Sequence, residues 1–77
     1  MQELLMTIAK GLVENPDQVS VEADEPNEEG VIVYHLHVAP DDMGRVIGKQ
    51  GRIAKAIRTV MRAAANRQET KVAVEID

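Results

Sequence analysis

Hydrophobic residues at the start of the chain follow the period of a helix. They recur at the three- to four-residue spacing that places side chains on one helical face: Leu4, Leu5, Ile8, Leu12 and Val13. The pattern ends at Asn15-Pro16, because the residue before a proline disfavours the helical region. The sequence therefore predicts an amphipathic N-terminal helix.

After Pro16 the period changes to two, which is typical of strands. Val19, Val21 and Ala23 alternate with polar residues, and a turn-like segment at 25–30 separates them from the β-branched run 31–38. One face of that run carries Ile32, Tyr34, Leu36 and Val38, and the other carries Val31, Val33, His35 and His37. We expect two strands joined by a turn, with the Tyr34 face directed to the core.

A helical period returns in the second half of the chain and is interrupted once. Pro40 stops the strand, and Asp41 is a candidate N-cap for a short helix to about Ile47. Gly48-Lys49-Gln50-Gly51 then breaks the pattern, and from 52 to 66 an apolar arc lies opposite a cationic arc. The predicted core arc holds Ile53, Ala56, Ile57, Val60 and Ala64, and the cationic arc holds Arg52, Lys55, Arg58 and Arg62.

The last segment, 70–77, alternates again and predicts a final strand with Val72, Val74 and Ile76 on one side. The order of elements is therefore α-β-β-α-α-β. In 77 residues there is no repeat and no linker, so we expect one domain over 1–77.

The composition excludes several classes of protein. Apolar residues make up 44% of the chain, which is typical of a globular domain, and the lack of cysteine fits a reducing compartment. No apolar run approaches the ~20 residues of a membrane helix, and the N-terminus does not resemble a signal peptide. We expect a cytoplasmic, unanchored protein. A core this small, with no disulfide, also favours oligomerisation.

Charge is divided unevenly along the chain. The formal net charge is -4, but residues 1–44 carry ten acidic side chains against Lys10, whereas 45–71 carry eight basic side chains against Glu69. The local field of the basic segment decides what can approach it, so an acidic pI does not exclude a nucleic acid.

Two glycines with the spacing Gly48-x-x-Gly51 stand within this basic segment. Without Cβ atoms, the backbone of such a turn can come within hydrogen-bond distance of another chain, and a helix that starts at Gly51 favours a phosphate. Lys49 places a cation at the tip of the turn, and three more cations flank the same path: Arg45, Arg52 and Lys55. An ordinary helix-turn-helix corner is the alternative for the glycines, and a solvated helix face is the alternative for Arg58 and Arg62.

The octapeptide Val46-Ile47-Gly48-Lys49-Gln50-Gly51-Arg52-Ile53 resembles the signature of KH domains, in which a GxxG loop between two helices holds about four nucleotides of single-stranded nucleic acid. The element order resembles the type II form. The resemblance implies an α+β fold with a three-stranded mixed sheet and helices on one face. We expect Gly48 and Gly51 to admit the strand, and Lys49 and Gln50 to contact phosphate or sugar. The resemblance implies that residues around Val46, Ile47 and Ile53 support or line a base groove.

Over nearly all of its length the chain is similar to the KhpA family of small, stand-alone bacterial KH proteins. This resemblance implies RNA binding linked to cell growth and division, with a homodimer or a larger KH-containing partner of the KhpB or Jag family. Two other hypotheses remain open: a protein-interaction module to which RNA is incidental, and binding of single-stranded DNA, which differs in the 2′-OH. Tyr34 is the one aromatic residue, so an aromatic stacking platform is not available.

Catalytic and metal sites are not predicted. Ser20 is the only serine, no cysteine is present, and the stretch 44–50 fails as a Walker A motif, because Gln50 stands where Ser or Thr must hold magnesium. His35 and His37 share a strand face without further ligands, so they are predicted to be exposed histidines. We expect no enzyme activity, no metal and no cofactor.

Overall fold

The computed structural model describes residues 1–76, and of Lys49 only the backbone. Its elements in chain order are α1 (Gln2–Leu12), the 3-10 turn η1 (Pro16–Gln18), β1 (Ser20–Ala23), β2 (Val31–His37), α2 (Pro40–Arg67) and β3 (Lys71–Ile76). The final strand was predicted to extend to Asp77, which lies outside the described residues.

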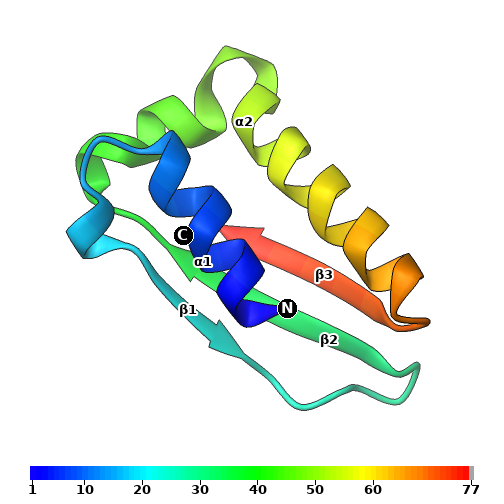
Figure 1. The fold of residues 1–77 in the computed structure, drawn as a ribbon. Coiled ribbons are helices and arrows are strands. Elements are labelled where there is room, and N and C mark those ends of the chain that lie inside the picture. The colour runs from blue at the N-terminus through cyan, green and yellow to red at the C-terminus, as the bar shows by residue number, and fades with distance from the viewer. Residues whose placement is uncertain (77) are drawn as a thin grey trace.

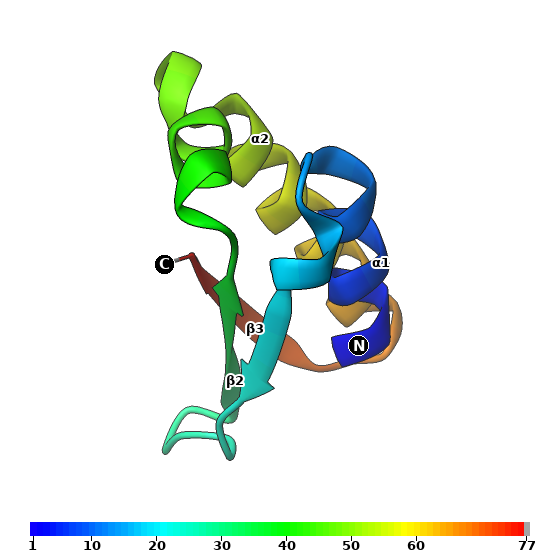
Figure 2. The same cartoon turned by 90° about the vertical axis from the view of Figure 1, so that its left-hand side faces the viewer.

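The three strands form one mixed sheet with β2 in the centre (Figure 1). β1 runs antiparallel to β2, with Val21 opposite Leu36, and β3 runs parallel to β2, with Tyr34 opposite Val74. A parallel neighbour requires a crossover connection, and α2 supplies it by carrying the chain back to the start of β3. Both helices cover the same face of the sheet (Figure 2). The predicted α+β fold is thus confirmed.

A sharp change of direction divides α2 into two segments, seen at the top of Figure 1. Gln50 and Gly51 are consecutive residues in the left-handed region, with φ of 65° and 70°. Left-handed residues cannot continue a right-handed helix, so the helical path of α2 changes direction at these two residues. The interruption and the order α-β-β-α-α-β agree with the sequence-based prediction.

The core lies between the helices and the inner face of the sheet. Its largest fully buried side chains include Leu5, Leu36, Val46, Ile57 and Met61. Tyr34, predicted to point inward, is 5% exposed. Alternation in the strands therefore identified the buried face correctly.

The predicted core arc of α2 was partly wrong. Ala56 and Val60 are exposed, and the buried side chains are Ala54, Ile57, Met61 and Ala65. The real arc is rotated by about 90° around the axis, at about 100° per residue. Apolar residues extend over both arcs, and Val60 is 44% exposed while the adjacent Met61 is fully buried, so the apolar pattern defines no unique stripe.

Two details near the helix ends also differ from the predictions. In α1, Leu4 and Leu12 are 37% and 40% exposed, because the buried side is centred on Leu5 and Ala9. Asp41 is not the N-cap of α2: Ala39 occupies that position and Pro40 opens the helix. Proline suits the first turn, where its missing N–H has no helical partner to lose.

Candidate nucleic-acid interface

The two glycines of the GxxG turn are in different local environments. Gly51 has a φ of 70°, a conformation that glycine adopts at little cost and other residues rarely adopt. Gly48 has no left-handed φ, and a methyl group added to it would meet nothing within 4 Å beyond its own turn of helix. The backbone therefore requires glycine at 51, whereas neither the backbone nor the packing requires it at 48.

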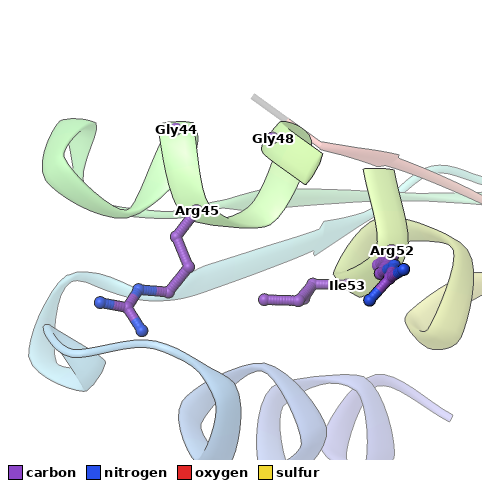
Figure 3. Close-up of a pocket in the computed structure, with 5 residues that line it drawn as sticks. All are labelled: Gly44, Arg45, Gly48, Arg52 and Ile53. Carbon is purple, nitrogen blue, oxygen red and sulfur yellow. The ribbon is translucent and has the colours of Figure 1, made fainter. Parts of the chain in front are cut away.

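A cavity of about 360 Å³ opens beside this turn, between the two segments of α2. Its lining residues, shown in Figure 3, are Gly44, Arg45, Gly48, Arg52 and Ile53. Gly44 and Gly48 lie one helical turn apart and leave that wall without side chains, while two guanidinium groups and one aliphatic group complete it. The structure thus brings together Arg45, Gly48, Arg52 and Ile53, four of the residues predicted for the site.

Other predicted site residues are placed around this cavity. Gln50, Arg52 and Lys55 are exposed, and the side chain of Lys49 lies outside the described part of the structure. Val46 is fully buried, so it can support a groove but not line one, whereas Ile47 is 50% exposed. Gly44 was missed, although its spacing of four residues from Gly48 is a signal visible in the sequence.

Arg45 is held by an acidic partner from a distant part of the chain. Its Nη2 pairs with Oε1 of Glu14, which follows α1. Figure 3 shows the Arg45 side chain extending toward that segment, away from Gly48. In this arrangement one predicted phosphate contact is neutralised within the protein.

Asp42 fixes the position of that segment, and the sequence analysis missed it. Its carboxylate accepts hydrogen bonds from the backbone N–H groups of Glu14 and Asn15, both at 3.0 Å, and from Asn15 Nδ2 at 3.1 Å. The bond from the Glu14 N–H is the largest cause that lowers the pKa of Asp42 below its ordinary value, against the opposing effect of burial. Since donor and acceptor lie 28 residues apart, no local sequence signal could have revealed this contact.

A second, smaller cavity of about 190 Å³ lies on the other flank of α2, against β3. It is lined by Arg58, Arg62, Val72, Ala73 and Val74. Arg58 Nε donates to the Val74 carbonyl at 3.2 Å, so this guanidinium is tied to the edge strand. The cationic arc is therefore divided between two flanks of the helix.

The histidines on the outer face of the sheet are half-buried rather than exposed as predicted. The imidazole of His35 lies between two carboxylates, with Nε2 2.9 Å from Asp24 Oδ2 and Nδ1 3.4 Å from Glu75 Oε2.

Within residues 1–76, as far as they are described, no group of three or more His, Cys, Asp or Glu could hold a metal ion. Among the same residues, no helix has the length and apolar character to cross a bilayer.

Comparison with known proteins gives consistent matches over nearly the whole chain. Residues 2–76 match the family model described as KhpA/KhpB, KH domain. A Clostridium acetobutylicum protein named RNA-binding protein KhpA is 59% identical over 76 residues, which cover 99% of each chain. Proteins with the same name from Listeria monocytogenes and Treponema pallidum are 46% and 45% identical, covering 99% and 97% of this chain and 97% and 91% of their own.

Proposed function

The chain belongs to the KhpA/KhpB family of KH domains, and from this premise we propose that it binds single-stranded RNA at the turn between the two segments of α2. The family is not enzymatic, so binding rather than catalysis is the activity to be explained. The observation that carries the proposal is Gly48. Nothing in the fold requires glycine there, and unlike Gly11, which is equally unconstrained, Gly48 lines the cavity beside the turn, where the lack of a side chain leaves room for a ligand backbone.

The chemistry around Gly48 suits a phosphate. The second segment of α2 starts at this turn, so its first N–H groups and the positive end of its dipole face the incoming strand. Arg52 and Lys55 are exposed beside it and supply cations for neighbouring phosphates. Lys49 and Gln50 contact phosphate or sugar at the tip of the turn, and Gly48 with Gly51 admits the backbone of the strand.

Bases are held without aromatic stacking in this proposal. Ile47 and Ile53 offer partly exposed aliphatic surface on either side of the turn, and Val46 supports them from within the core. Such a groove gives shape and backbone contacts rather than a stacking platform, which is the mode of KH recognition.

The test is a charge reversal at the tip of the turn, Lys49→Asp with Gln50→Asp. Binding of a fluorescent single-stranded RNA should be lost, while circular dichroism and the melting temperature stay nearly unchanged, because Gln50 is exposed. The matched control is Lys10→Asp with Gln18→Asp, which exchanges the same residue types at two exposed positions elsewhere. Equal affinity of the folded double mutant and the control would exclude the turn as the binding site. A DNA strand of the same sequence tests whether the 2′-OH is recognised.

A second candidate function is pairing with another KH domain, favoured by exposed apolar side chains on α2. Ile47 and Val60 are 50% and 44% exposed, and Leu4 and Leu12 of α1 are also partly open. The partner would be a second copy or a larger KH protein of the KhpB or Jag family, and the pair would act in RNA regulation linked to cell growth and division. A homodimer would place two binding sites on one RNA and raise its apparent affinity.

Sedimentation equilibrium over a hundredfold range of concentration tests self-pairing. The mean mass should rise above 8.5 kDa with concentration, and the melting temperature should fall on dilution. A constant mass near 8.5 kDa, with a melting temperature independent of concentration, would rule the homodimer out.

A further inference from the structure

The ion pair between Glu14 and Arg45 places a carboxylate where a nucleic-acid phosphate would bind. We propose that Glu14 is an internal competitor for Arg45, which sets the affinity and selectivity of the proposed RNA site. This inference rests on the proposed function and concerns the regulation of the same site. A guanidinium binds carboxylate and phosphate through N–H donors of the same kind, so the two acceptors compete for the charge of Arg45.

Three observations support this role of Glu14. Arg45 lines the cavity beside Gly48, so it belongs to the surface that the strand would meet. Its side chain nevertheless extends away from Gly48 (Figure 3) and pairs with Glu14. The backbone N–H of Glu14 donates to the buried carboxylate of Asp42, so this acid is held beside α2 and is not a freely moving surface residue.

The pair is partly open to water, which makes competition possible. The Arg45 side chain is 49% exposed and the Glu14 side chain 69% exposed. Exposed pairs of this kind contribute little stability, and a phosphate of the strand can therefore displace the carboxylate at small cost. A strand whose phosphate does not reach the cavity leaves Arg45 neutralised, so the pair weakens nonspecific electrostatic binding more than binding in register.

The experiment compares Glu14→Gln with Asp17→Asn. Both variants remove one negative charge from the segment after α1, but Asp17, exposed in η1, is not the acid that holds Arg45. Glu14→Gln should bind single-stranded RNA about two- to fivefold more tightly than the wild type, and Asp17→Asn should change affinity less than that. The Glu14 substitution keeps the backbone bond to Asp42, so the melting temperature serves as the check that the fold is intact.

A double-mutant cycle decides whether the effect passes through Arg45. In an Arg45→Gln background, Glu14→Gln should give no larger gain than Asp17→Asn, because the competed guanidinium is gone. Three results would overturn the proposal. In the wild-type background, they are a loss of affinity in Glu14→Gln or a gain no larger than that of Asp17→Asn. In the Arg45→Gln background, the contrary result is a Glu14→Gln gain as large as in the wild type. None of these results would affect the proposed function, which depends instead on the response to the Lys49 and Gln50 reversal.

Discussion

Three identical substitutions, glycine to alanine at 11, 48 and 51, should have three different outcomes. At Gly51 the φ of 70° places the new Cβ in the left-handed region, which costs about 1–2 kcal/mol, partly offset by a less flexible unfolded chain. We expect a net loss of about 1 kcal/mol and a melting temperature lower by ~4–8 °C in a domain of this size.

At Gly11 the same substitution should stabilise the protein. Gly11 lies in the last turn of α1, its φ is not left-handed, and an added methyl would meet nothing within 4 Å beyond its own helix turn. Alanine in such a helical position gains about 0.5–1 kcal/mol over glycine. RNA affinity should not change, which makes Gly11→Ala the reference for the other two variants.

Gly48→Ala separates folding from binding. The environment of Gly48 resembles that of Gly11, so the Gly48→Ala protein should be at least as stable as the wild type. The added methyl group, however, would stand in the cavity that admits the strand. We expect RNA binding at least tenfold weaker, an effect of about 1.4 kcal/mol or more.

Thermal and urea unfolding, followed by circular dichroism, together with RNA binding by fluorescence anisotropy, measure all three variants. A Gly51→Ala protein as stable as Gly11→Ala would refute the left-handed turn. Unchanged RNA binding by a stable Gly48→Ala protein would refute the argument that glycine at 48 serves ligand approach.

Two further predictions concern Asp42 and the response to salt. Because the folded state lowers the pKa of Asp42, its contribution to stability is complete above the ordinary aspartate value of about 3.9 and is lost as pH falls below it. The urea midpoints of wild type and Asp42→Asn should therefore converge as pH falls from about 4 through the lowered pKa of Asp42, and a gap independent of pH would contradict this cause. For RNA binding, about three phosphate contacts by Lys49, Arg52 and Lys55, with a fourth by Arg45 where a phosphate displaces Glu14, give a slope of about -2 to -3 in a plot of log affinity against log salt, at ~0.7 per contact. A slope of about -4 would mean that Arg58 and Arg62 also lie along the strand, at ~0.7 per contact.

The strands could be predicted from the sequence because their period is unambiguous. Tyr34, Leu36 and Val38 share one face of a β-branched run, and a shift by one residue would have buried His35 instead. The interruption of α2 was predicted for a similar reason, since two glycines three apart break a helical pattern. In both cases the signal lies within a few residues of the feature it specifies.

The packing face of α2 could not be predicted in the same way. Apolar residues occupy two neighbouring arcs of the helix: Ala56 and Val60 lie on the exposed arc, and Ala54, Met61 and Ala65 lie on the buried one. A pattern of apolar and polar positions records polarity alone, and it does not record which of two apolar arcs the rest of the fold covers. The error of about 90° follows from this choice, at about 100° per residue.

The candidate site shows a different limit of prediction from sequence. The number of cationic side chains in the sequence is larger than the number that the fold leaves available to bind a phosphate. The sequence places eight basic residues in 45–71, but Arg45 is paired with Glu14 and Arg58 donates to the Val74 carbonyl. Both partners are distant in sequence, so neither could be identified before the fold was known. Arg52 and Lys55 remain exposed beside the turn, and for this reason a shallow salt dependence is expected from a segment with so high a local charge.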